Sequence, residues 1–217
     1  MFALVMLDLD GTLVDTAPEI AAAASAALAE HGLPPVGEAQ VRGWIGHGAR
    51  RLVARASGSD EADEALLRTF EWHYAAISGR RSAPYADAVP ALRELKRLGV
   101  TLALVTNKET RFTAPLLHAH DLWQWFDAVI CGDMVERRKP DPLGVEHCLA
   151  RFRIPRSRAL LVGDSEVDVA TARNAGVAVW TVPYGYHCGR LTGEAIPDRV
   201  IPTLRAVADA VESAVFL

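Results

Sequence analysis

Cysteine is scarce in this 217-residue sequence, and basic residues are not in excess. The three cysteines, Cys131, Cys148 and Cys188, are odd in number and show no Cys-x-x-Cys spacing. We therefore predict neither a disulfide framework nor a thiolate zinc site, and we expect a reducing, cytoplasmic location. The formal net charge of -4 and the scattered lysines and arginines provide no positive field for a nucleic-acid backbone, so we expect no nucleic-acid partner.

Long apolar runs are missing as well. The apolar segment at the N-terminus, Met1 to Leu7, is too short for a membrane span or for the apolar core of a signal sequence. It lacks a basic leader and runs directly into Asp8 and Asp10. This pattern predicts a buried first strand and no membrane association.

Several catalytic signatures are also absent. The sequence contains no GxxxxGK(S/T) phosphate loop, no complete GxGxxG, no GxSxG nucleophile elbow and no HExxH. NTPases, dinucleotide enzymes, serine hydrolases and zinc proteases therefore lose their usual sequence support.

What the chain does contain is a series of short apolar runs without two-fold alternation, which is typical of strands covered on both faces of a parallel sheet. These runs are Phe2–Leu7, Val100–Val105, Ala128–Cys131, Ala159–Val162 and Val177–Val182. The helix-like segments between them are Ala88–Leu98, Arg111–His120, Pro142–Phe152 and Glu166–Ala175, the last followed by Gly176 as a helix stop. The βαβα alternation predicts an α/β fold with a doubly wound parallel-sheet, Rossmann-like core.

One stretch interrupts this alternation. Between the first strand and about residue 80 no apolar strand occurs, and segments rich in Ala, Leu, Glu and Arg predict several helices. We predict a core of residues 1–15 and 82–217, with an inserted helical cap domain of residues 16–81 and a return hinge over residues 79–84. The predicted helix starts lie at or near Pro18, Gly48 and Asp60.

Polar side chains follow several predicted strands at the point where each strand ends. Asp8 and Asp10 follow the first apolar run, Thr106 and Asn107 the second, and Asp164 the fourth. Ligands of an open parallel sheet bind in the crevice at the carboxyl ends of its strands. We therefore expect these side chains to meet in one site.

The acids of this predicted site suit a hard divalent cation. Asp8 and Asp10 are two residues apart, so in an extended segment their side chains point the same way and repel each other when both are ionised. Together with Asp164 and Asp168 they form a set of acidic oxygens that suits Mg2+. Asp168 also has a simpler interpretation, because acids are favoured in the first turn of a helix.

The same residues predict phosphoryl transfer. With Mg2+ holding a phosphate oxygen, Asp8 would attack phosphorus, while Asp10 would protonate the leaving alcohol and later deprotonate the hydrolytic water. Thr106 would offer a hydroxyl and Lys139 a compact positive charge to the transition state. Lys139 would also hold Asp8 in its ionised form.

Four segments resemble the motifs of the haloacid dehalogenase superfamily of phosphotransferases. In order they are DLDGTLVD at 8–15, VTN at 105–107, RKPDP at 138–142 and GDSEVD at 163–168. The resemblance implies Asp8 as nucleophile and Asp10 as acid/base. It also implies Mg2+ held by Asp8, the backbone carbonyl of Asp10 and Asp164, with Asp168 in support. In that superfamily Asp10 favours phosphoryl transfer over carbon–halogen cleavage, and the helical insertion would be the mobile cap that selects the substrate.

Within the superfamily, the cap segment Val41–Ala49 is similar to the signature of the bacterial phosphoglycolate phosphatases, although His47 stands where Asn is usual. The resemblance implies that the partner is a small phosphate ester, 2-phosphoglycolate. Amides at the start of the helix after Gly48 would suit its carboxylate, and Arg50 would add positive charge. The predicted substrate-binding residues are Gly46, His47, Gly48, Arg50, Thr106 and Asn107.

Other functions stay open at this point. A phosphatase for a sugar phosphate or pyrophosphate, or a phosphosugar mutase, would use the same aspartate. A signalling receiver is disfavoured because its nucleophile is not expected in an Asp-x-Asp-Gly-Thr segment, and a silent binding protein because every catalytic position is filled. The sequence leaves the oligomeric state unknown.

Five further residues suggest sites but have simpler interpretations. We interpret His118 and His120 as helix-end residues rather than a metal pair, and Trp123 and Trp125 as packing residues. Cys188 is interpreted as part of a plain loop, in spite of its neighbour His187.

Overall fold

A parallel β-sheet forms the centre of the protein in the computed structural model, which describes residues 1–187 and 193–214. Its strand order is β5-β4-β1-β6-β7-β8, and every neighbouring pair is parallel. The strands are β1 (Leu4–Leu7), β4 (Thr101–Val105), β5 (Ala128–Ile130), β6 (Ala159–Gly163), β7 (Ala178–Thr181) and β8 (Arg199–Val200). The predicted α/β, Rossmann-like fold is confirmed, and the five predicted strands lie where the apolar runs placed them.

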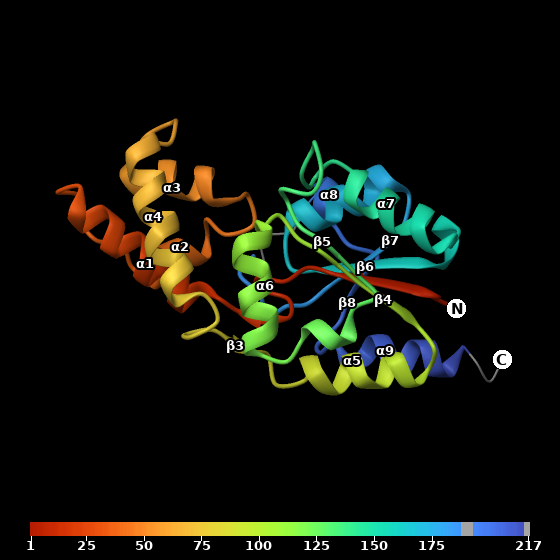
Figure 1. Ribbon diagram of the computed structural model, residues 1–217. Helices are drawn as coiled ribbons and strands as arrows, with labels where there is room; N and C mark the ends of the chain where they lie inside the picture. Colours follow the sequence, from red (N-terminus) through yellow and green to blue (C-terminus); the bar gives the residue numbers. More distant parts are fainter. Residues whose placement is uncertain (188–192, 215–217) are drawn as a thin grey trace.

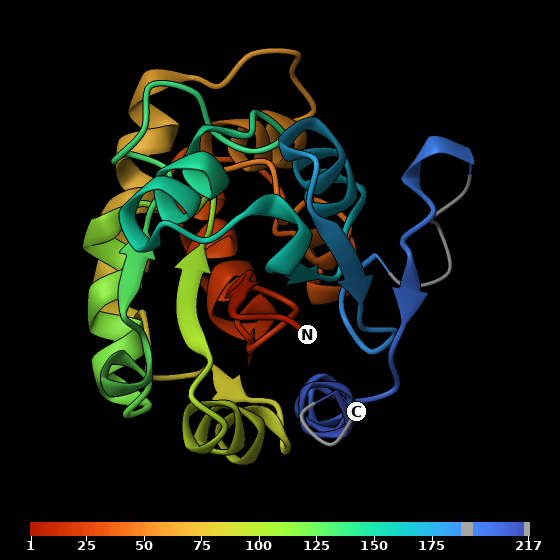
Figure 2. The same cartoon turned by 90° about the vertical axis from the view of Figure 1, so that its right-hand side faces the viewer.

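Helices cover both faces of this sheet (Figure 1). On one face lie α5 (Ala88–Arg97) and α9 (Arg205–Ser213), which Figure 2 shows side by side. On the other lie α7 (Leu143–Phe152) and α8 (Glu166–Ala175). Gly176 ends α8 in the left-handed conformation, at φ +67°, as the helix stop predicted. Because β1 is buried between these two layers, its residues Leu4 to Leu7 are almost fully excluded from solvent.

A second group of helices packs around its own hydrophobic cluster, away from the sheet (Figure 1). We call it the helical cluster. It consists of α1 (Ala17–Glu30), α2 (Glu38–Arg42), α3 (Ala49–Ser57) and α4 (Glu64–Ile77). The prediction of helices here is confirmed, with a proline in the first turn of α1 as expected. The five-residue helix α2 was not predicted, because it is too short to show a helical period.

The helical cluster joins the core through two segments that lie next to each other. The outgoing strand β2 (Val14–Asp15) pairs antiparallel with the returning strand β3 (Ala83–Pro84), which falls in the predicted return hinge. Between cluster and sheet lies α6 (Thr110–Ala119), whose Phe112 packs into the helical cluster while Leu116 packs into the core. These contacts fix the position of the cluster over one end of the sheet.

The remaining sequence interpretations concern residues away from the site. Among the described cysteines, Cys131 and Cys148 are buried free thiols, whereas Cys188 lies outside the described residues. His118 lies in the last turn of α6 and stacks on Trp123 of the short 3-10 helix η1 (Trp123–Trp125) at a ring distance of 5.1 Å. Two other short 3-10 helices are η2 (Arg156–Arg158) and η3 (Gly193–Ala195). In the described part of the chain, no helix has the length and hydropathy needed to cross a membrane.

Candidate active site

The carboxyl ends of the central strands and the helical cluster enclose a cavity of about 60 Å³. Asp8 reaches it from the end of β1, and Thr106 and Asn107 reach it from the end of β4. The helical cluster contributes a largely apolar wall on the opposite side. The wall residues are Ile20, Ile45, Gly46, Gly48, Ala49, Leu52, Phe70 and Tyr74.

A buried acidic group lies at the core side of this cavity. Carboxylate oxygens of Asp8, Asp164 and Asp168 lie within 4.8 Å of one another, and all three residues are buried. Lys139 inserts its Nζ between them, 2.9 Å from Asp8 Oδ1 and 2.7 Å from Asp168 Oδ1. The backbone at Gly11 lies close to the Asp164 carboxylate. Only glycine fits there, because its φ is +80° and a Cβ would lie 2.5 Å from Asp164 Oδ2.

The charge of this group fits a divalent cation. Three carboxylates and one ammonium give a net charge of -3 + 1 = -2 when all four groups are ionised. Buried charge of one sign is unfavourable without a counter-charge, and hard oxygen donors are the ligands that Mg2+ prefers. The residues Asp8, Asp164 and Asp168 therefore suit Mg2+.

Burial also changes the proton affinity of these acids. It raises the pKa of Asp8 to about 6, because desolvation and the neighbouring carboxylates outweigh the opposing effect of Lys139. Desolvation and Asp168 raise the pKa of Asp164 well above its usual value. Burial lowers the pKa of Lys139, but Asp168 and Asp8 outweigh this effect and raise it overall, so the lysine stays charged. Lys139 lowers the pKa of Asp8, which is the direction expected from the sequence, although burial has the larger effect.

Asp168 is both a member of the acidic group and a residue in the first turn of α8. Its Oδ2 accepts hydrogen bonds from the backbone N–H of Ser165, at 3.2 Å, and from the Ser165 hydroxyl, at 2.5 Å, so it belongs to the capping box at the start of α8. Its Oδ1 accepts from Lys139. The helix start therefore holds the carboxylate in place beside the acidic group.

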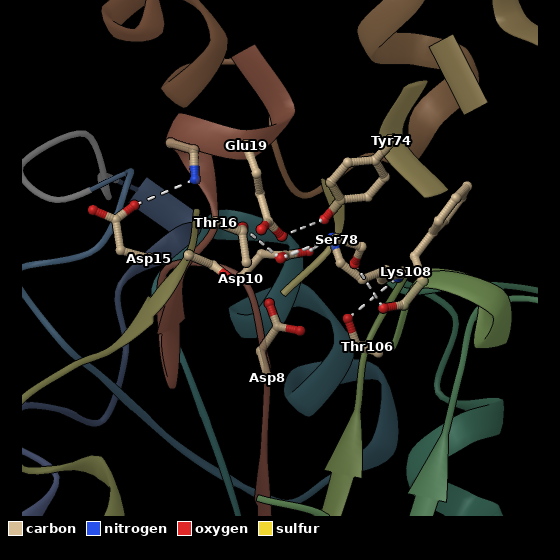
Figure 3. Close-up of polar contacts among 12 residues, drawn as sticks. Asp8, Asp10, Asp15, Thr16, Glu19, Tyr74, Ser78, Thr106 and Lys108 are labelled. Carbon is tan, nitrogen blue, oxygen red and sulfur yellow. Dashed lines mark hydrogen bonds and ion pairs between the residues drawn. The ribbon is translucent and has the colours of Figure 1, made fainter. Parts of the chain in front are cut away.

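The Asp10 carboxylate has its own partners, Thr16 and Lys108, near which Figure 3 shows it. Its Oδ1 accepts a hydrogen bond from the Thr16 hydroxyl at 2.6 Å, and Lys108 Nζ lies 2.9 Å from its carboxylate. Within the described residues, the Asp10 carboxylate is not part of the group that could hold a metal ion. A direct contribution from Asp10 would use its backbone carbonyl, as the family resemblance implied.

The two residues after β4 connect the core to the helical cluster. Thr106 is buried and its hydroxyl accepts the N–H of Lys108 at 3.2 Å. Asn107 Nδ2 donates to the backbone carbonyls of Gly46 and Lys139, each at 2.9 Å. Asn107 thereby links the cap segment Val41–Ala49 to the loop that carries Lys139.

Of the substrate-binding residues predicted in the helical cluster, only some lie at the cavity. Gly46 and Gly48 line it, and Gly48 precedes α3 at φ +86°. Burial, together with Arg51 and Arg55, lowers the pKa of His47, whose ring faces Glu166 of the core at 3.9 Å. The Arg50 side chain forms an ion pair with Glu64, is 62% exposed and, among the described residues, is not one that lines the cavity. The structure thus places Arg50 outside the predicted site, because α3 turns its side chain toward the start of α4.

Several residues of the site were not predicted. Lys108 immediately follows Thr106 and Asn107, and this adjacency could have identified it. Tyr186 donates its N–H to Asp164 Oδ2 at 2.6 Å, and its phenol oxygen accepts the N–H of Thr16 at 2.7 Å, so it connects the acidic group to the start of α1. No local pattern indicates this role.

The fold and the four converging segments define a known class of enzyme. The chain matches the family described as haloacid dehalogenase-like hydrolase over residues 5–182. It therefore belongs to that hydrolase family, and the resemblance seen in the sequence is confirmed.

Several similar proteins within that class are named phosphoglycolate phosphatase. The chain is 44% identical to phosphoglycolate phosphatase 1 of Pseudomonas aeruginosa, covering 97% of this chain and 80% of that protein. It is 38% identical to the phosphoglycolate phosphatase of Thiobacillus denitrificans, covering 94% and 93%. A crystal structure of a predicted phosphoglycolate phosphatase from Haemophilus somnus superimposes with a TM-score of 0.87 at 30% identity, covering 96% of this chain and 97% of that one.

Proposed function

We propose that this enzyme is a Mg2+-dependent phosphomonoesterase that hydrolyses 2-phosphoglycolate to glycolate and phosphate through an aspartyl-phosphate on Asp8. The observation that carries the proposal is the buried group of Asp8, Asp164 and Asp168 around Lys139, at the carboxyl ends of the central strands. The proteins named phosphoglycolate phosphatase support the choice of substrate through their identity over nearly the whole chain.

The first step joins the phosphoryl group to the enzyme. A carboxylate oxygen of Asp8 attacks phosphorus, the bond from phosphorus to the glycolate oxygen breaks, and the proton of Asp10 passes to that oxygen. Bound Mg2+ would neutralise the acids and polarise the phosphate during this step. Lys139 and the Thr106 hydroxyl donate to the phosphoryl oxygens as negative charge spreads over them.

The second step returns the enzyme to its starting state. Asp10, now ionised, takes a proton from water, whose oxygen attacks the phosphorus of the acyl phosphate. The bond between phosphorus and Asp8 breaks, and inorganic phosphate leaves. The pairing of Asp10 with Lys108 and Thr16 supports this role, because it holds the carboxylate apart from the metal-binding acids.

We further propose that the helical cluster acts as the cap, residues 16–81, and selects the substrate. The amides that follow Gly46 and Gly48 at the start of α3 would hold the carboxylate of 2-phosphoglycolate. The apolar side chains of Ile20, Leu52 and Phe70 offer no partners for the hydroxyls of a sugar phosphate. A small ester is therefore favoured over a sugar phosphate. The free thiols Cys131 and Cys148 suit the cytoplasmic location that belongs to this proposal.

The test is phosphate release from 2-phosphoglycolate, phosphoserine, sugar phosphates and pyrophosphate, each with Mg2+ or EDTA. We expect release that depends on Mg2+, is strongest with 2-phosphoglycolate and is lost in Asp8→Asn. A stronger reaction with another ester would overturn the role of the cap but keep the chemistry. A phosphoenzyme that persists in water until a second hydroxyl compound arrives would identify a mutase instead.

A further inference from the structure

The pairing of Lys108 with Asp10 takes place at the boundary between core and cap. Lys108 Nζ lies 2.9 Å from the Asp10 carboxylate, and the two side chains are only 6% and 12% exposed. Lys108 belongs to the loop after β4, whereas the second partner of Asp10, Thr16, directly precedes α1. The orientation of the Asp10 carboxylate therefore depends on groups from two segments.

A tyrosine of the cap lies against the same lysine. Lys108 Nζ is 4.9 Å from the centre of the Tyr74 ring, within the range of a cation–π contact. Tyr74 comes from α4 and is 2% exposed. The Lys108 ammonium therefore has two partners: it forms an ion pair with Asp10, and the Tyr74 ring packs against it from the side of the cap (Figure 3).

A buried glutamate fixes the position of this tyrosine. The Tyr74 hydroxyl donates to Glu19 Oε1 at 3.1 Å, while Glu19 Oε2 accepts the backbone N–H of Gly79 at 2.9 Å and that of Arg81 at 3.4 Å. Glu19 is fully buried on α1, and Gly79 and Arg81 belong to the return segment of the cap. Burial, with Asp10 and Glu19 nearby, raises the pKa of the Tyr74 phenol well above its usual value, so it stays a donor.

We propose that Tyr74, held by Glu19, is a positioning residue that acts through Lys108 to align the carboxyl group of Asp10 for proton transfer. The inference rests on the proposed function, since it assumes that Asp10 is the acid and base. Its consequence is that α4 of the cap completes the acid/base machinery of the core: proton transfer is efficient only while Tyr74 lies against Lys108.

The test compares two phosphate esters that lack a carboxylate, so that substrate recognition by the cap does not enter. The leaving group of ethyl phosphate needs a proton, whereas p-nitrophenolate leaves without one. In a two-step mechanism kcat/KM covers only the steps up to release of the alcohol or phenol, so it reports the acid role of Asp10 alone.

We expect Tyr74→Leu to lower kcat/KM for ethyl phosphate about tenfold, part of the 10²–10⁴-fold contribution of a general acid, and to change kcat/KM for p-nitrophenyl phosphate less than about twofold. Tyr74→Phe and Glu19→Gln, which keep the packing, should give smaller losses with the same selectivity. In an Asp10→Asn background Tyr74→Leu should cause no further loss, because the residue acts through Asp10.

The matched control is Leu67→Ala, a buried residue two turns earlier on α4 that, among the described residues, is not one that lines the cavity. It should leave the ratio of the two kcat/KM values unchanged. Equal losses with both esters in Tyr74→Leu, or a loss that persists in the Asp10→Asn background, would overturn the inference. If Asp10→Asn itself left kcat/KM for ethyl phosphate unchanged, the proposed function would fail. If Asp10→Asn lowered this kcat/KM but Tyr74→Leu left it unchanged, the inference alone would fail.

Discussion

Replacing Lys139 by methionine should destabilise the protein strongly in the absence of metal. The ammonium of Lys139 is the counter-charge for Asp8 and Asp168, at 2.9 and 2.7 Å, and its side chain is 5% exposed. Methionine keeps most of the length of the side chain but removes the charge. Removing one partner of a buried ion pair costs about 3–5 kcal/mol, because the remaining charge is left uncompensated.

Urea denaturation in EDTA measures this loss as a fall in the free energy of unfolding. The control is Lys96→Met, because Lys96 pairs with Asp127 at 2.8 Å with about a third of each side chain exposed. An exposed pair of this kind contributes about 0–1 kcal/mol. Adding Mg2+ should narrow the difference between wild type and Lys139→Met, since the cation supplies part of the missing positive charge. A loss below about 1 kcal/mol in EDTA, or one that Mg2+ leaves unchanged, would refute this reasoning.

Three further predictions follow from the same geometry. Burial raises the pKa of Asp8 from 3.8 to about 6, so the folded protein binds this proton more tightly than the unfolded chain. In EDTA this group should therefore raise the free energy of unfolding by up to about 3 kcal/mol as the pH falls from about 7 to about 4, and Asp8→Asn should lack that rise in parallel urea titrations. Mg2+ at about 100 times its Kd should stabilise the wild type by about 2.7 kcal/mol, and Asp164→Asn should abolish most of this gain in thermal melts. Arg50→Ala should change kcat/KM for 2-phosphoglycolate less than about twofold, whereas Gly48→Asp should lower it more than about tenfold; equal effects would contradict the assignment of the cavity wall.

The sequence predicted the core strands well because their residues are mostly buried and therefore read as continuous apolar runs. β1 and β6 are examples, with every residue buried. The two exposed residues of β8 carry no such signal, since Arg199 and Val200 lie at the edge of the sheet. Strand prediction from apolar runs thus works where the strand is apolar, as in the edge strand β5, and fails for the short exposed strand β8.

The site residues also differ in whether the sequence could identify them. Asp8, Asp164 and Lys139 are recognisable because each follows a strand or belongs to a short ordered motif. Tyr74 and Glu19 could not be predicted, because their roles arise from contacts between segments far apart in the sequence, which no local spacing encodes. Arg50 shows the opposite error: a positive charge near the expected loop suggested a ligand contact, but the direction of its side chain depends on the helix that carries it.

In the proposed mechanism Asp8 carries the phosphoryl group during turnover. The most direct measurement is acid quenching of the Asp10→Asn variant during reaction with p-nitrophenyl phosphate and Mg2+, followed by mass spectrometry of the peptide that contains Asp8. This variant should accumulate the intermediate, because p-nitrophenolate leaves without a proton while the base that activates water is missing. We expect one phosphoryl group on Asp8, absent with EDTA and in Asp8→Asn. Release of p-nitrophenolate without any phosphoryl group on Asp8, or a phosphoryl group on a different residue, would contradict this mechanism.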